Sequence, residues 1–417
     1  MKNILLLSLL FIVRISFAQT APQKILFDAR KAEMASNADW IIDADIYNIG
    51  TGTGGIMQTG RGNEANPQRI PTPAQSGITA STSETYWKGA LSAWAVACVK
   101  QGFIVETLPY NVSITYGNTS NPQDLSNYKI YIVDEPNIKF TTTEKTAIIQ
   151  FVQNGGGLFM ISDHDVSDRN NDGYDSPHIW NDLMSTNSIA TNPFGITFDY
   201  QNFSQTTSNF KVSSTDGILH GLAGNPTQMK FSNGTSMTLN TSANSTVIGV
   251  VYKTGSSTTG TSGVMMAHSH YGLGKIAAIG DSSPMDDGTG DTGDVLYNGW
   301  SAEVNGDHSK IMMNATIWLS NNTARIGDVA SSTSSTFNVW PNPVHDFTNV
   351  QFIGYAPNET YNILLLDLSG RILNTFIGSS IEGINKIQIP VEQLSKGIYL
   401  IQLQQQDNIL TKKIIVY

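Results

Sequence analysis

Hydrophobic residues follow two different patterns along this chain of 417 residues. Between about residues 20 and 325, short apolar runs alternate with segments in which apolar residues recur at helical spacing. Short continuous apolar runs are typical of strands that are buried on both faces. They predict strands at residues 24–28, 103–108, 128–133, 158–162, 245–252, 263–268 and 275–281.

Three intervening segments predict helices. Residues 83–102 carry apolar side chains at helical spacing and end in glycine, and residues 142–153 begin with threonines and precede three glycines. A third helix is expected at 307–321. Strands that alternate with helices predict an α/β fold, in which helices cover both faces of a mostly parallel sheet as a three-layer α/β/α sandwich.

The last part of the chain has a different periodicity. After a run of Ser and Thr at 331–336, apolar and polar residues alternate with a period of two, as in half-buried strands separated by turns. This pattern predicts a C-terminal all-β sandwich. The expected division is a signal peptide at 1–18, an α/β domain at 19–325, a linker at 326–336 and the β-sandwich at 337–417.

Four ordered motifs occur in this tail. They are WPNP at 340–343, LDLSGR at 366–371, GIY at 397–399 and KKIIV at 412–416. With these motifs the tail resembles the C-terminal sorting domain of type IX secretion substrates. The resemblance implies type IX secretion machinery as a partner, and a protein that is secreted or attached to the cell surface. A carbohydrate-binding sandwich is the alternative, and we expect no catalysis in the tail.

The first 18 residues have the organisation of a signal peptide. Lys2 precedes an apolar stretch at 4–13, and Ser16-Phe17-Ala18 has the small-residue spacing that signal peptidase cleaves. The stretch is too short for a stable membrane span, although an uncleaved anchor is the alternative. Since no later run is long enough to cross a bilayer, we expect a mature chain without a transmembrane anchor.

Composition excludes several classes of function. Hydrophobic residues make up 40% of the chain, enough to bury a core and to exclude a wholly disordered protein. With 34 Asp and Glu against 24 Lys and Arg, the net charge of −10 disfavours nucleic-acid partners, because an acidic surface repels phosphates. Cys98 is the single cysteine, so neither an internal disulfide nor a thiolate metal cluster is available.

Glycine-rich motifs in the α/β region resemble those of the class I glutamine-amidotransferase-like superfamily, in its trehalose-utilisation-type branch. The matching segments are FVQNGGGL at 151–158, YGLGK at 271–275, and His308 followed by NATIWL at 314–319. The resemblance implies the same α/β fold. Where amidotransferases carry a nucleophilic Cys after the central strand, this chain has Ser162-Asp163-His164, which excludes hydrolysis of glutamine by a thiolate.

Acidic residues follow several of the predicted strands. Asp28 ends the first strand, Asp134 and Glu135 follow the third, Asp163 and His164 the fourth, and Asp281 the last. Ligands bind beyond the carboxyl ends of parallel strands, so we expect these side chains to converge. Gathered carboxylates repel one another and favour a cation. We therefore predict a divalent metal, with Asp163, His164 and Asp281 as catalytic residues and Asp28 as a ligand.

The segment after the fourth strand predicts further metal ligands. Asp168, Asn170 and Asp172 have the alternate oxygen spacing of a calcium loop, although its usual last Glu is missing and Asp175 or Asp182 would replace it. A solvated acidic loop is the alternative. Asp165, with Asp163, His164 and His178, could instead bind Zn²⁺ or Mn²⁺. Ca²⁺ is the cofactor expected first.

Further candidate residues lie outside this segment. His270 is a candidate base, and a Ser162–His270–Asp281 triad is conceivable, although no glycine-flanked turn exposes Ser162. Asp286 and Asp287 open an acidic, glycine-rich loop that could bind substrate. Trp40 could stack on a sugar ring, with a place in the core as the alternative. Residues 48–75 predict a long irregular loop, typical of a lid.

Two functions fit these features. The first is a secreted metal-dependent hydrolase that cleaves a glycosidic, ester or phosphoester bond in an extracellular polymer or its fragments, with a metal-bound water as the attacking group. The second is a non-catalytic protein, stabilised by calcium, that binds a carbohydrate or another surface ligand.

Overall fold

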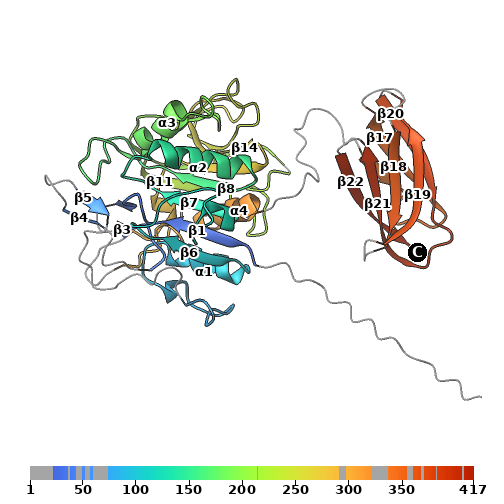
Figure 1. Ribbon diagram of the computed structural model, residues 1–417, viewed down its shortest axis with the longest axis horizontal. Coiled ribbons are helices and arrows are strands. Elements are labelled where there is room, and N and C mark those ends of the chain that lie inside the picture. Colours follow the sequence, from blue (N-terminus) through green and yellow to red (C-terminus); the bar gives the residue numbers. More distant parts are fainter. Residues whose placement is uncertain are drawn as a thin grey trace, which may run out of the picture. The chain divides into compact units, whose positions relative to one another are not determined.

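A computed structural model of the chain forms two compact units, Met1–Asn321 and Asn322–Tyr417 (Figure 1). It describes residues 22–35, 38–43, 49–51, 57–59, 74–213, 215–290, 297–320, 337–354, 360–367, 371–381, 383–405 and 408–417. The expected signal peptide and linker, and most of the expected loop at 48–75, lie outside the described residues. Within them, no helix is long and apolar enough to cross a membrane.

The first unit is built on a mixed sheet of nine strands, in the order β6-β1-β7-β8-β15-β14-β12-β9, with β13 paired to β14. The five strands from β6 to β15 pair in parallel, and the pairings beyond β15 are antiparallel. The strand bounds are β1 Lys24–Asp28, β6 Ile104–Leu108, β7 Ile130–Asp134, β8 Gly157–Ile161, β9 Ile196–Phe198, β12 Met237–Leu239, β13 Ile248–Tyr252, β14 Val264–Tyr271 and β15 Gly274–Ile279. The mostly parallel sheet expected from the sequence is therefore correct only for its first five strands.

Consecutive residues of the central strands contribute to two separate apolar clusters. Ile25 and Phe27 pack in one cluster, which includes residues of α1 (Ser92–Lys100) and α4 (His308–Ser320). Leu26 packs in the other, which includes residues of α2 (Thr142–Gln153) and α3 (Ser176–Thr186). Because side chains alternate between the faces of a strand, both faces of the sheet are buried, which explains the continuous apolar runs.

The helix expected at 83–102 is shorter than predicted. A 3₁₀ turn at Glu84–Tyr86 comes first, and α1 begins only at Ser92. Between them, Ala90 has a positive φ of 57° and forms a parallel bridge with Ile41. A non-glycine residue in this conformation cannot continue a right-handed helix, so the apolar periodicity overstates the helix.

Short strand pairs complete the first unit, and its last element is α4. The pairs are β2 Met34–Ala35 with β3 Ala38–Asp39, β4 Ile49–Thr51 with β5 Met57–Thr59, and β10 Phe203–Thr207 with β11 Met229–Gly234. Further 3₁₀ turns lie at Leu125–Asn127 and Ser283–Met285.

In the described part of the second unit, the named strands pair antiparallel in two sheets, in the orders β16-β17-β20 and β19-β18-β21-β22. One apolar cluster includes Val350 of the first sheet and Ile363 of the second. The strand bounds are β16 Phe337–Trp340, β17 Phe347–Gly354, β18 Thr360–Leu366, β19 Ile372–Ser379, β20 Gly383–Pro390, β21 Gly397–Gln405 and β22 Asn408–Val416. The expected C-terminal all-β region is confirmed.

Candidate functional site

The carboxyl ends of three neighbouring parallel strands bring acidic residues to one level of the sheet. Asp134 at the end of β7 pairs with Ile161 of β8, and Ile161 pairs with Ile279 of β15. Asp163 and Asp281 follow their strands at the same distance, two residues after the paired isoleucines. The parallel register therefore accounts for the predicted approach of Asp163 to Asp281.

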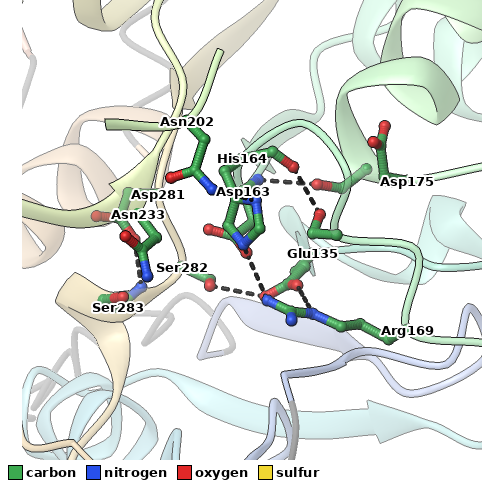
Figure 2. A network of polar contacts seen from close by, with 12 residues as sticks. Glu135, Asp163, His164, Arg169, Asp175, Asn202, Asn233, Asp281, Ser282 and Ser283 are labelled. Atoms are coloured by element: carbon green, nitrogen blue, oxygen red, sulfur yellow. Dashed lines mark hydrogen bonds and ion pairs between the residues drawn. The ribbon is translucent and has the colours of Figure 1, made fainter. Parts of the chain in front are cut away.

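Glu135 lies at the centre of the polar network at this edge (Figure 2). Its buried carboxylate accepts hydrogen bonds from Trp40 Nε1 at 2.9 Å and from Ser282 Oγ at 2.7 Å. Arg169 Nε donates to it at 3.0 Å, and Arg169 Nη2 donates to Asp163 Oδ2 at 2.9 Å. Two carboxylates from different strands are thus held by one guanidinium group.

Sequence reasoning named Glu135 only as a neighbour of a strand end and missed Arg169. A signal for Arg169 was present, because it is the one basic residue in the acidic segment 163–175. A buried acidic site normally needs such a cation.

Trp40 does not present its ring to a ligand. Only 2% of its surface is exposed, and its ring packs in the cluster that contains α1 and α4. The predicted stacking on a sugar is therefore wrong, and Trp40 instead supports Glu135 through its indole N–H.

Burial raises the pKa of several carboxyl groups at this edge. Burial, and then the nearby charges of Glu135 and Asp281, raise the pKa of Asp163 well above its usual range, although Arg169 opposes the shift. Burial raises the pKa of Asp281 to about 7 against the hydrogen bonds from Ser283 and Ser232. Burial at this edge thus favours the neutral forms of Asp163 and Asp281 more than water does.

Asp134 is the most isolated carboxyl group of the network. It is buried, and among the described residues neither of its oxygen atoms has a hydrogen-bond partner. Burial, followed by the charges of Glu135, Asp281 and Asp286, raises its pKa well above the usual range. An unpartnered carboxylate is costly in such surroundings, so burial favours the protonated form of Asp134.

Asp286 and Asp287 are also buried rather than presented to a substrate. Asp287 accepts hydrogen bonds from the Ala93 amide in the first turn of α1 at 2.6 Å and from the Thr289 amide at 2.7 Å. Asp286 accepts one from the Gly288 amide at 2.9 Å. Both carboxylates thus order the loop after β15, contrary to their predicted contact with substrate. Residues 291–296 of this loop lie outside the described residues.

His164 lies at the start of the loop that follows β8. Its Nδ1 lies 2.6 Å from the Asp165 carbonyl oxygen and 3.0 Å from Asn202 Nδ2, and its Nε2 lies 3.6 Å from Asp163 Oδ2. The imidazole therefore connects the buried Asp163 to the segment around Asn202 (Figure 2).

The same loop and the first turn of α3 together hold a group of three potential metal ligands. Asp165, Asp175 and His178 each offer a ligand atom within 4.8 Å of the others, the one such set of His, Cys, Asp and Glu among the described residues. Asp175 caps α3, since its Oδ1 accepts from the His178 amide, and Oδ1 also lies 2.5 Å from His178 Nδ1. One imidazole and two carboxylates suit Zn²⁺ or Mn²⁺ better than Ca²⁺.

Asp168, Asn170 and Asp172 lie together in one turn, as their spacing suggested. The Asp172 and Gly173 amides donate to Asp168, the Asp172 amide also lies within hydrogen-bond distance of Asn170 Oδ1, and Gly173 has a φ of 94°. Backbone hydrogen bonds thus engage oxygen atoms that a calcium ion would use. Asp175 belongs to the other group, and binding of Ca²⁺ in this turn stays a prediction.

Asp28 lies in a different network. It lies on the same face of the sheet as Leu26 and Tyr131, and the Tyr131 hydroxyl group donates a hydrogen bond to Asp28. Because side chains alternate along β7, Asp134 points to the other face. The Arg30 and Lys31 amides donate to its Oδ1 at 2.6 and 3.0 Å. The structure therefore does not bring Asp28 into the network of Asp163 and Asp281.

His270 lies at the opposite edge of the sheet. The antiparallel pairing of β14 places it beside Lys275 at the start of β15, whereas Asp281 follows the end of β15. Six residues of strand separate the two levels by about 20 Å. The ring of His270 lies 5.4 Å from the ring of Trp318. A catalytic role beside Asp281, and with it the conceivable Ser162–His270–Asp281 triad, is therefore wrong.

Residues 338–417 match the family model of the secretion system C-terminal sorting domain. The second unit is a type IX secretion sorting domain. This confirms the predicted type IX secretion machinery as a partner, and it indicates export to the cell surface or to the medium. The match covers residues 338–417 alone.

Similarity to solved structures is weak. The chain is similar to the mmIFT52 N-terminal domain, with a TM-score of 0.37 and 16% identity over 61% of this chain and 97% of that chain. It is also similar to the cytoplasmic protein STM3548 from Salmonella typhimurium, with a TM-score of 0.34 and 10% identity over 71% and 98%. Similarity at this level assigns neither a fold family nor an activity. No curated protein matches the chain, and the amidotransferase-like resemblance stays a prediction.

Proposed function

We propose that the first unit is an exported, metal-dependent hydrolase that acts on an extracellular polymer or its fragments. One observation supports this proposal above the others: the loop after β8 and the first turn of α3 place Asp165, Asp175 and His178 within metal-binding distance of one another, directly beside Asp163 and His164. The loop lies at the carboxyl end of a parallel strand, where α/β sheets bind their ligands.

The residues of this loop have distinct roles in the proposal. Asp165, Asp175 and His178 hold the metal ion, which when bound supplies an activated water molecule. His164 transfers a proton, since imidazole is the group most often used for general acid–base catalysis. Asp163 and Asn202 orient the ring from opposite sides, and Arg169 holds Asp163 in place.

The substrate bond is a glycosidic, ester or phosphoester bond. The net charge of −10 and the acidic edge favour the first two, because a polyphosphate backbone is repelled by such a surface.

We also propose that the first unit is a three-layer α/β/α sandwich of the amidotransferase-like kind. Two apolar clusters on opposite faces of the sheet, one with α1 and α4 and the other with α2 and α3, support this architecture.

The second candidate function is a non-catalytic binding protein stabilised by calcium. The turn that gathers Asp168, Asn170 and Asp172 favours it.

Metal analysis combined with a substrate screen tests the hydrolase. We expect the purified mature chain to contain about one equivalent of Zn²⁺ or Mn²⁺ and to hydrolyse at least one of amylose, cellulose, chitin and acetylated xylan. Asp175→Asn and His178→Ala should lose both metal and turnover, and asparagine keeps the helix cap. His164→Ala should lose turnover and retain the metal.

His220→Ala is the matched control, because His220 is exposed and its Nε2 contacts the Ser213 carbonyl oxygen. This variant should retain metal and turnover. A chain that binds Ca²⁺, loses thermal stability in EDTA and consumes none of the polymers would refute the hydrolase and support the binding protein.

A further inference from the structure

A polar depression lies next to the Asp165/Asp175/His178 group, after β9 and around the start of β12. Its volume is about 520 Å³, within the usual range for ligand pockets. The lining residues that matter here are Asp199, Tyr200, Gln201, Ser236, Thr238 and Lys253. We infer that this polar depression binds a neutral saccharide. The assignment of that saccharide as a substrate rests on the proposed function, whereas its binding does not.

Two adjacent residues of the depression contact the potential metal ligands directly. The ring of Tyr200 stacks on the imidazole of His178, with 4.2 Å between ring centroids and 19° between ring planes. The carbonyl oxygen of Gln201 accepts a hydrogen bond from the Asp165 amide at 2.8 Å. A ligand held in the depression therefore lies beside the group that the proposed hydrolysis uses.

Donors and acceptors alternate along the lining. The Asp199 carboxylate accepts from Ser236 Oγ at 2.5 Å and from Thr238 Oγ1 at 2.8 Å. The Lys253 ammonium donates to Gln201 Oε1 at 3.0 Å. Such a surface offers charged acceptors and donors at short spacing, which matches the neighbouring hydroxyl groups of a sugar.

The charges of the depression argue for a neutral ligand. Asp199 and Lys253 are the acidic and the basic residue of the lining, so their charges balance. An anionic sugar would be attracted by Lys253 and repelled by Asp199 to a similar extent. Neutral hydroxyl groups can form favourable hydrogen bonds with both side chains.

Tyr200 supplies an accessible aromatic ring. Its side chain is 54% exposed, in contrast to the buried Trp40. An aromatic ring with a polar tip stacks on the apolar face of a sugar while its hydroxyl group stays in water. Tyr200 thus carries the role that the sequence suggested for Trp40, and it does so beside His178.

Calorimetric titration of the mature chain with cellohexaose, maltohexaose and chitohexaose, in EDTA, tests the inference. We expect at least one hexaose to bind, Tyr200→Ala and Asp199→Ala each to weaken binding at least about tenfold, and Tyr200→Phe to retain affinity. Tyr86→Ala is the matched control, since Tyr86 is also an exposed tyrosine at 40% and does not line the depression. Its affinity should equal that of the unchanged chain.

The inference is overturned if none of the hexaoses binds, or if folded Tyr200→Ala and Asp199→Ala bind as tightly as the unchanged chain. Circular dichroism establishes that the variants are folded. Binding that depends on Tyr200 and Asp199 without hydrolysis of any hexaose, with or without added Zn²⁺, supports this inference and refutes cleavage of the glycosidic bonds in these saccharides.

Discussion

The carboxylate of Glu135 accepts hydrogen bonds from three distant parts of the chain, at Trp40, Arg169 and Ser282. Its own backbone has a positive φ of 45°, a conformation that the surrounding contacts must hold in place. Removal of this side chain leaves the half-buried guanidinium group of Arg169 short of one carboxylate and leaves the buried indole N–H of Trp40 without its acceptor.

Glu135→Ala should therefore lower the free energy of unfolding of the first unit by about 3–5 kcal/mol, as measured by urea denaturation. Lys310→Ala serves as the control, because the Lys310–Asp307 ion pair is exposed and should contribute less than about 1 kcal/mol. Equal effects of the two substitutions would show that the Glu135 network does not stabilise the fold.

The buried acids predict an unusual dependence of stability on pH. Burial raises the pKa of Asp286 to about 7 and that of Asp287 to about 6. A raised pKa in the folded state contributes stability that is present in acid and is lost as pH rises through the folded value. Carboxyl groups with a lowered pKa, such as Glu303 at about 2, act in the opposite direction only in stronger acid.

The free energy of unfolding should thus fall as pH rises from about 4 to about 7, and Asp286→Asn should flatten this slope. Urea denaturation at a series of pH values measures both. A slope that is zero or positive in the unchanged chain would contradict the assignment of buried, protonated acids.

At the scale of elements, the β14–β15 hairpin packs closely against the end of α2. Gly272 has a φ of 58°, and the Leu273 amide donates to the Gln153 carbonyl oxygen at 2.9 Å. A Cβ atom at Gly274 would collide with the carbonyl oxygens of Val152 and Gly156. The YGLGK motif therefore has a packing reason that is independent of any activity.

Gly274→Ala should destabilise the first unit by about 2–3 kcal/mol, since backbone carbonyls cannot move aside at low cost. Its neighbour Leu273 is 74% exposed, so Leu273→Ala should change stability by less than about 0.5 kcal/mol. Thermal denaturation of both variants measures the difference. If Gly274→Ala is as stable as the unchanged protein, the hairpin does not pack as closely against α2 as described.

At the scale of the whole molecule, two units have separate apolar cores and separate roles. The first contains the two clusters on its central sheet, and the second has its own cluster and the sorting-domain match. Each unit therefore has the means to fold independently.

Calorimetry of the mature chain should accordingly resolve two transitions, and deletion of residues 338–417 should remove one and leave the other unchanged. In the producing cell, the same deletion should retain the protein inside the outer membrane, as cell fractionation measures. A shift of the remaining transition, or unimpaired export, would contradict the division of roles.

The sequence by itself determined the features that depend on local pattern. Continuous apolar runs predicted most strands of the central sheet, helical spacing predicted the bounds of α2, and period-two alternation predicted the all-β tail, because burial imposes these patterns on any chain. Acidic residues at strand ends predicted the approach of Asp163 to Asp281, since parallel strands end at one edge.

The face of the sheet on which a side chain lies, the end of the sheet at which it lies and the depth of its burial depend on tertiary packing, which a local pattern does not encode. Asp28 and Asp134 point to opposite faces of the sheet because of their alternate positions in paired strands. His270 lies far from Asp281 because β14 runs antiparallel to β15. Both facts follow only from the strand pairing. Trp40 and Tyr200 are both aromatic residues beside acids, yet only packing made one of them a buried donor and the other an accessible ring.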